Sequence, residues 1–121
     1  MRDYWVKTTD TDAIERIIHR SNRVPQFIYK HSTRCGVSSH TYRELSDVTD
    51  ELIPDIEINY VDVIANRDVS NEIAERLDVE HQSPQLLLIQ SNKVVWKASH
   101  YDIEADVIKE KAKEAIKALA V

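Results

Sequence analysis

Segments with strand-like and helix-like spacing of apolar residues alternate along this chain, and their order limits the folds that it can adopt. A helix is predicted at 12–20, and a short strand follows at 26–30. Apolar residues then recur at the helical period over 36–52, before a more continuously apolar strand at 56–63. Another helix is predicted to start near Asp68. The chain is therefore an α/β protein whose first two strands flank a helix.

The second half of the chain ends in two strands and a helix. The most apolar run, 86–89, is joined to a strand at 94–98 by a short polar segment, so the two strands must pair as an antiparallel hairpin. A last helix is predicted over 104–120. Because a right-handed crossover makes the first two strands parallel, we expect a central mixed four-stranded sheet with helices on both faces and an extra N-terminal helix. This is the element order of the thioredoxin fold, and we expect one such domain over 1–121.

Composition narrows the possible functions. The chain has 16 Lys and Arg against 21 Asp and Glu, a formal net charge of −5, which argues against nucleic-acid binding. No segment approaches the roughly 18 apolar residues of a membrane-spanning helix, and residues 1–12 are too polar for a signal peptide. One cysteine allows no internal disulfide, which suits a reducing compartment. We expect a cytoplasmic monomer that binds neither nucleic acid nor membranes.

The one cysteine of the chain, Cys35, directly precedes the one glycine, Gly36. With a single glycine, the chain lacks the glycine-rich loops that bind phosphates. Cys35 stands where a predicted strand gives way to a helix, and a helix N-terminus carries partial positive charge. Arg34 adds a full charge, and both favour the thiolate, the nucleophilic form. The alternative is an inert buried thiol. Gly36 leaves room for the backbone of a partner.

Two positions complete a candidate thiol site. Ser38 lies three residues after Cys35, where a second cysteine would make a CxxC dithiol motif. A serine hydroxyl can hydrogen-bond a thiolate or cap the helix, but it cannot resolve a mixed disulfide. Pro84 precedes the apolar strand, where thioredoxin-like folds carry a cis-proline opposite the cysteine. We predict a cis bond there, which would expose the backbone of Ser83 to an extended thiol ligand.

The histidines and aromatic residues indicate no further site. One cysteine and scattered histidines do not make a closed zinc site, so we expect no metal. His31 and His100 could approach the thiol, but nothing in the sequence supplies the orienting group of a Cys–His pair. We therefore expect solvated histidines. Trp96 and Tyr101 are expected in or beside the core, with the lining of a ligand groove as the alternative. Trp5 is expected near the first helix.

With these residues in place, the chain resembles the monothiol bacilliredoxin family, also called bacillithiol-system redox-active or general stress proteins. The features that match lie in the same order and extend over nearly the whole chain. They are His31-Ser32-Thr33-Arg34 before Cys35, Ser38, the Ser83-Pro84-Gln85 step, and Trp96 with Ser99-His100 before the last helix. One departure is Gly36, where the family commonly has proline.

The resemblance implies a cytosolic thiol–disulfide exchange protein that removes bacillithiol, a low-molecular-weight thiol, from mixed disulfides on client proteins. Cys35 would be the catalytic nucleophile. The supporting residues would be Thr33, Arg34, Gly36 and Ser38. The groove for the thiol ligand or client would contain Ser83, Pro84 and His100. No cofactor would be tightly bound, and bacillithiol, glutathione or coenzyme A would satisfy the same residues as co-substrate.

Three other interpretations remain open. The sequence from Cys35 to Ser38 also resembles the CGFS motif of monothiol glutaredoxins, which carry a [2Fe-2S] cluster with glutathione. Those proteins use a Gly-Gly pair before the last helix, and this chain has no second glycine. Arsenate-reductase-like proteins share C-G-x-S, but the segment from Cys35 to Pro84 is too short for their inserted helices. A non-catalytic stress or binding module on the same fold would have a cysteine pKa near the ordinary value of about 8.5.

Overall fold

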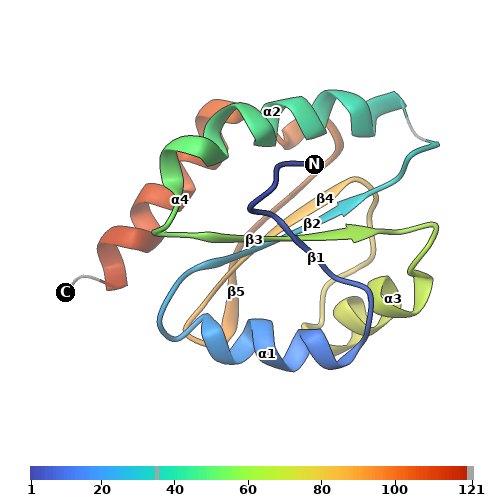
Figure 1. Ribbon diagram of the computed structural model, residues 1–121, viewed down its shortest axis with the longest axis horizontal. Coiled ribbons are helices and arrows are strands. Elements are labelled where there is room, and N and C mark those ends of the chain that lie inside the picture. Colours follow the sequence, from blue (N-terminus) through green and yellow to red (C-terminus); the bar gives the residue numbers. More distant parts are fainter. Residues whose placement is uncertain (35, 120–121) are drawn as a thin grey trace.

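The computed structural model describes residues 1–34 and 36–119, in which strands and helices alternate as far as β4 and β5 then follows directly (Figure 1). The helices are α1 (Asp12–Arg20), α2 (Gly36–Leu52), α3 (Arg67–Arg76) and α4 (Ala105–Leu119), with a short 3-10 helix, η1 (His100–Asp102), before α4. The strands are β1 (Val6–Lys7), β2 (Gln26–His31), β3 (Glu57–Asp62), β4 (Gln85–Gln90) and β5 (Lys93–Ser99). The predicted nucleophile, Cys35, lies outside the described residues.

The sheet contains five strands in the order β1-β3-β2-β4-β5. Strands β1 and β2 both run parallel to β3, whereas β4 is antiparallel to β2 and to β5. The mixed sheet and the β4–β5 hairpin are therefore confirmed. The prediction of four strands is wrong, because β1 adds a fifth strand at the edge. Two residues are too few to show the alternation by which a strand is recognised in a sequence.

Helices cover both faces of the sheet, with α2 and α4 on one face and α1 and α3 on the other (Figure 1). Each face has its own cluster of buried apolar side chains. Alternation along β2 connects the two clusters, because Phe27 and Tyr29 belong to the α2–α4 cluster and Ile28 to the α1–α3 cluster. All six residues of β2 are buried, as expected for a central strand covered on both faces.

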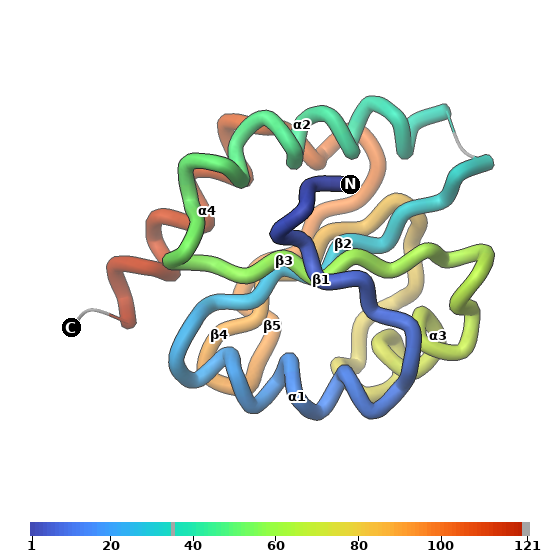
Figure 2. The backbone as a smooth tube through the Cα atoms, in the orientation of Figure 1, coloured from blue at the N-terminus to red at the C-terminus, as the bar shows by residue number. Residues whose placement is uncertain are grey.

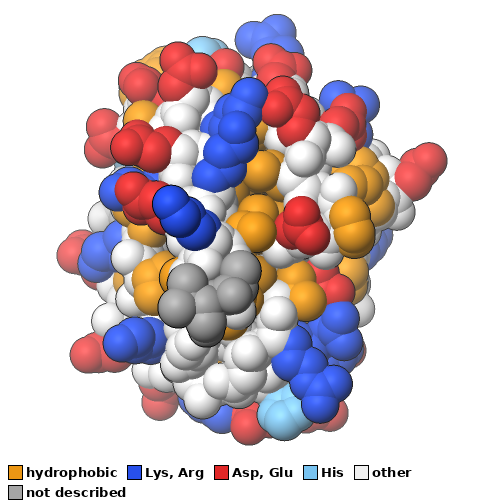
Figure 3. Space-filling model, turned by 90° about the vertical axis from the view of Figure 1, so that its left-hand side faces the viewer, with side chains coloured by type: hydrophobic (Ala, Val, Ile, Leu, Met, Phe, Trp, Pro, Cys, Tyr) orange, Lys and Arg blue, Asp and Glu red, His pale blue; other side chains and the backbone are white. Residues whose placement is uncertain are grey.

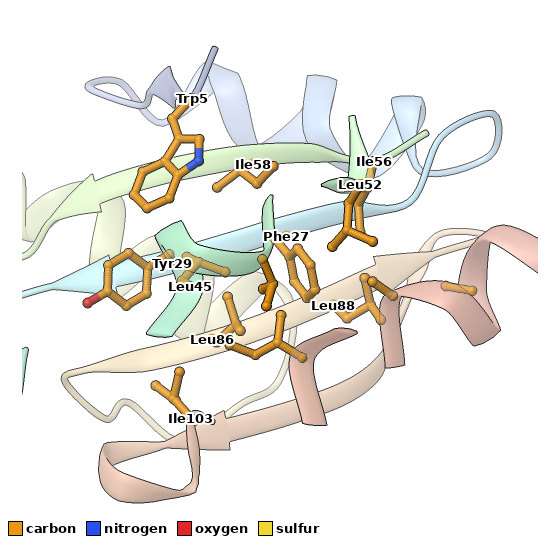
Figure 4. Packing of buried hydrophobic residues seen from close by; sticks show 14 residues of the cluster. Trp5, Phe27, Tyr29, Leu45, Leu52, Ile56, Ile58, Leu86, Leu88 and Ile103 are labelled. Atoms are coloured by element: carbon orange, nitrogen blue, oxygen red, sulfur yellow. The ribbon is translucent and has the colours of Figure 1, made fainter. Parts of the chain in front are cut away.

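The α2–α4 cluster is closed at one edge by Trp5 (Figure 4). Its side chain is 3% exposed, its ring stacks on that of Tyr60 at 6.2 Å, and its indole Nε1–H donates to Oγ1 of Thr49 in α2 at 3.3 Å. The prediction that Trp5 packs near α1 is wrong. The N-terminal segment passes below α2 before it pairs with β3 (Figure 1), and this places Trp5 on the other face from α1.

The surface carries mixed charge. Figure 3 shows the end of the molecule that lies away from the N-terminus of α2, where acidic and basic side chains alternate with apolar ones. Ion pairs such as Arg20–Glu57 and Lys109–Glu51 join neighbouring elements. No helix among the described residues is long and apolar enough to cross a membrane.

Candidate functional site

The candidate site is at the end of the sheet where β2 and β3 finish and where α2 and β4 begin (Figure 2). The β2–β4 register pairs Lys30 with Gln85. Pro84, which directly precedes Gln85, therefore lies beside the C-terminal end of β2. The segment that contains Cys35 leaves β2 at the same end and enters α2 at Gly36. The topology thus brings the flanking residues of the cysteine and the predicted proline to one end of the sheet.

Ser38 closes the turn between β2 and α2. Its side chain is 0% exposed, and its Oγ accepts a hydrogen bond from the backbone N–H of Ser32 at 3.2 Å. Its backbone C=O accepts hydrogen bonds from the hydroxyl groups of Tyr29 and Thr41, each at 3.2 Å. Ser38 therefore ties together the residues before and after Cys35. A hydrogen bond from Ser38 to the thiolate stays a prediction.

Tyr29 and His31 lie beneath this turn, and both are buried. The Tyr29 hydroxyl is 3.0 Å from Nδ1 of His31 and 2.9 Å from Oγ1 of Thr41, and the His31 ring lies 5.6 Å from that of Tyr60. Burial lowers the pKa of His31, against the opposing effect of nearby Asp62. The prediction of solvated histidines is wrong for His31. The residue follows Tyr29 by two positions in the strand, which puts its side chain on the same covered face.

The residues immediately around Cys35 are open to solvent. Thr33, Arg34 and Gly36 are exposed, and a Cβ added to Gly36 would meet no atom within 4 Å. The first turn of α2 contains no acidic residue, so no carboxylate there offsets the partial positive charge of the helix N-terminus. Exposed neighbours and a nearby helix N-terminus suit a reactive thiol, while the individual roles of these residues stay predictions.

The Ser83–Pro84 peptide bond is cis, as predicted, and Ile53–Pro54 at the far end of α2 is also cis. The C=O of Pro84 accepts a hydrogen bond from the backbone N–H of His100 at 3.1 Å. His100 is exposed and has a φ of 53°, a left-handed conformation that few non-glycine residues adopt. The Oγ of Ser83 is buried without a hydrogen-bond partner among the described residues. The structure thus brings together the three residues predicted to form a groove.

The helix η1 also contacts α2. The ring of Tyr101 lies 5.8 Å from that of His40, and Tyr101 is 64% exposed. The prediction that Tyr101 packs in or beside the core is wrong, because the η1 turn gives the buried position to Ile103, which is 0% exposed. Trp96 packs against the α2–α4 cluster, as predicted. An exposed aromatic side chain therefore lies next to His100, near the candidate groove.

A buried polar cluster behind the segment with Ser83 and Pro84 was missed by the sequence analysis. Lys30 is 0% exposed, and its Nζ donates to the C=O of Ser70 in α3 at 3.1 Å and lies 3.2 Å from Nδ1 of His81. Burial lowers the pKa of Lys30 from 10.5 to about 8. The pKa of His81 is lowered by its own burial and by the positive charge of Lys30. The one sequence signal was Lys30 itself, a charged residue directly after the run Phe27-Ile28-Tyr29 of a predicted strand.

Comparison with known families matches residues 6–108 to the family described as Monothiol bacilliredoxin BrxC. This chain belongs to the monothiol bacilliredoxin family. The matched span contains Cys35 and all of the residues just described, so the predicted family is confirmed. The family and the fold are those of thiol redox proteins.

Solved structures confirm the thioredoxin fold. A proposed oxidoreductase with a thioredoxin fold is 28% identical to this chain. The match has a TM-score of 0.79 and covers 91% of this chain and 94% of that one. Thioredoxin from Trypanosoma brucei brucei has a TM-score of 0.74 at 20% identity and covers 97% of both chains. Chloroplastic thioredoxin z has a TM-score of 0.73 at 21% identity and covers 98% of both.

One curated protein also shows partial similarity. It is a phosphoribosylaminoimidazole-succinocarboxamide synthase from Chelativorans sp. (strain BNC1), 28% identical over 60 residues. The match covers 50% of this chain and only 22% of that protein. This chain therefore spans less than a quarter of the length of that relative, and the activity in its name is not carried over.

Proposed function

We propose that this bacilliredoxin-family protein is a monothiol exchanger that removes a low-molecular-weight thiol, bacillithiol in the first instance, from mixed disulfides on client proteins. The observation that carries the proposal is the place of the one cysteine. Cys35 directly precedes α2, and the residue three positions later is the buried Ser38. In this proposal the protein acts as a cytoplasmic monomer, with client proteins and the small thiol as its partners.

The first step transfers the small thiol from the client to Cys35. The Cys35 thiolate attacks the sulfur of the small thiol, a bond forms between these two sulfur atoms, and the bond from the small thiol to the client breaks. The client leaves as a thiolate and takes a proton from water. The N-terminus of α2 and the exposed Arg34 support this step, because both place positive charge beside the cysteine.

The second step regenerates Cys35 from outside the chain. Ser38 has a hydroxyl where a resolving thiol would stand, and no other cysteine is present. A second small-thiol molecule, as its thiolate, attacks the sulfur of the small thiol bound to Cys35. The Cys35 thiolate leaves and the small thiol becomes a symmetrical disulfide. The second small thiol is therefore the reductant, and no bound cofactor takes part.

The groove residues would orient the disulfide for attack. Ser83 and Pro84 lie at the same end of the sheet as the residues that flank Cys35. A partner bound in extended form to the backbone of Ser83 would reach the thiol, and the open space at Gly36 would admit its chain. His100, hydrogen-bonded through its backbone to Pro84, would border this groove.

Intact mass spectrometry tests the proposal. The reduced protein is mixed with a test protein that carries one mixed disulfide to bacillithiol and, in parallel, with the same protein carrying glutathione. We expect the wild-type chain to gain the mass of the small thiol as the client loses it, and the Cys35→Ser variant to do neither. The relative rates of the two reactions give the preferred thiol.

Failure of both transfers would contradict the proposal. Cys35 would then not be a competent exchanger, and the protein would be a non-catalytic module or a carrier of an iron–sulfur cluster. Visible absorption of the anaerobically purified protein separates these two accounts, because only a bound cluster absorbs there.

A further inference from the structure

We infer that Lys30 and His81 form a positioning pair that holds the segment carrying Ser83 and Pro84 against the sheet. This inference rests on the proposed exchange function. It names two residues that would determine the affinity for the mixed disulfide of a client. Neither side chain is placed at the reacting sulfur atoms, so both are positioning residues rather than catalytic ones.

His81 lies in the middle of an irregular segment, 77–84, that joins α3 to β4, and Lys30 lies in β2. Nδ1 of His81 lies 3.2 Å from Nζ of Lys30 and 3.3 Å from Oγ of Ser70. A neighbouring contact, from Nε2 of Gln85 to the C=O of Glu80 at 3.0 Å, closes the same segment onto β4. These contacts attach the segment to β2, α3 and β4 immediately before the cis-proline.

The direction of the hydrogen bond defines the state of His81. An ammonium group has only donors, so Nδ1 of His81 must accept and the ring proton must be on Nε2. Burial lowers the pKa of His81, and the positive charges of Lys30 in β2 and Arg67 in α3 lower it further. His81 is therefore neutral where this contact is made.

The lysine has a specific contribution that an apolar residue could not make. A buried ammonium group is costly to desolvate, and Lys30 forms no ion pair with an acidic side chain among the described residues. Methionine would fill the same space at lower desolvation cost. What Lys30 adds are the hydrogen bonds that it donates toward Ser70 and His81, which link a central strand to segment 77–84.

The position of the pair predicts which part of the reaction it affects. Lys30 and His81 lie on the α3 face of the sheet, whereas Ser38 and Tyr29, which hold the turn before α2, lie on the α2 face. Loss of the pair should free Ser83–Pro84 to shift without disturbing the turn around Cys35. Binding of a mixed disulfide should therefore weaken, while the intrinsic reactivity of the thiol is retained.

The test compares variants that remove the pair with variants that preserve it. Lys30→Met removes the donor, and His81→Leu removes the acceptor. His81→Asn keeps an acceptor near the place of Nδ1 without a titrating ring. Lys93→Met, at an exposed lysine of β5, is the control for loss of one positive charge. Circular dichroism and thermal unfolding establish that each variant is folded.

Two kinetic readouts separate positioning from general damage. For Lys30→Met and His81→Leu, we expect KM for the mixed-disulfide client to rise about tenfold or more, with kcat within about threefold of wild type. Iodoacetamide reacts with the thiol without binding in the groove at Ser83 and Pro84. Alkylation of Cys35 should therefore stay within about twofold of the wild-type rate. His81→Asn and Lys93→Met should behave as wild type in both assays. An unchanged KM, or alkylation that falls in parallel with exchange, would overturn the inference.

A structural readout keeps the test independent of activity. In the wild-type protein with ¹⁵N-labelled histidine, the NMR signal of Nδ1 of His81 should be that of an unprotonated ring nitrogen at neutral pH. Lys30→Met should increase amide hydrogen exchange in segment 77–84, while exchange at the start of α2, 36–38, is unchanged. A protonated Nδ1, or unchanged exchange in this segment, would overturn the inference. Absence of exchange activity in wild type would instead contradict the proposed function.

Discussion

Gly36 is the one glycine of the chain, yet its surroundings do not require one. It is the first residue of α2, no glycine in the structure has a positive φ, and an added Cβ would meet no atom within 4 Å. Alanine would therefore restrict the unfolded chain without a clash. We expect Gly36→Ala to raise the free energy of unfolding by about 0.4–1 kcal/mol. Urea denaturation of the reduced protein measures this change, and a loss of stability would contradict it.

Ser38 is at the position of a resolving cysteine, but the contact it makes is structural. Ser38→Ala leaves the backbone N–H of Ser32 without its acceptor, which should lower the free energy of unfolding by about 1 kcal/mol. Ser39→Ala is the matched control, since Ser39 is an exposed serine in the same helical turn. Urea denaturation of both variants provides the comparison. Equal stability of the two would show that the Ser38 hydroxyl does not hold the turn.

At the scale of elements, the buried Lys30 in β2 should make the free energy of unfolding depend on pH. The pKa of Lys30 falls from 10.5 to about 8 on folding, so between these values the unfolded chain binds more protons than the folded one. Stability therefore increases as the pH rises through this window. The Lys30→Met variant has no titrating side chain at this position. Relative to it, the wild-type free energy of unfolding should rise by about 2–3 kcal/mol between about pH 8 and pH 10.5. Urea denaturation at several pH values gives this difference, and a constant difference would contradict the burial of a charged lysine.

Apolar periodicity was sufficient to predict the larger elements. Buried residues of α2 recur at the helical period, and α1 and α2 span the predicted residues. Strand β1 could not be predicted, because its two exposed residues carry no pattern. The exposed position of Tyr101 depends on the η1 turn at His100, whose left-handed backbone is unusual for this residue type.

Only those parts of the candidate site could be predicted that depend on residues adjacent in the sequence or on the order of the elements. The cis bond before Pro84 followed from its place ahead of a strand in a thioredoxin-like order. The contact between Lys30 and His81 joins residues 51 positions apart, and it depends on the β2–β4 register and on the path of segment 77–84. The spacing of residues in the sequence encodes neither the register nor the path of this segment. The sequence therefore offered no reason to expect a histidine in contact with a buried lysine.

Across the whole molecule, the two faces of the sheet support different sides of the site. The α2–α4 face holds the turn that leads into α2 through Tyr29, Thr41 and Ser38. The α1–α3 face holds segment 77–84 through Lys30 and His81. Alternate residues of β2 face opposite sides, so one central strand contributes to both supports. In the proposed function, substitutions on the α2–α4 face should therefore alter the turn that leads into α2, and substitutions on the α1–α3 face should alter segment 77–84.

The same architecture predicts a monomer in solution. Helices cover both faces of the sheet (Figure 1), and the exposed large apolar side chains belong to separate segments, among them Val6, Ile53 and Val95. Such scattered side chains do not make the large apolar surface of a stable dimer. Under reducing conditions, light scattering after size exclusion should give a mass near 14.0 kDa. Oxidation with diamide should produce a dimer through Cys35 that dithiothreitol reverses and that Cys35→Ser does not form. A dimer that persists in reductant, or in Cys35→Ser, would show an interface between folded chains and contradict the prediction.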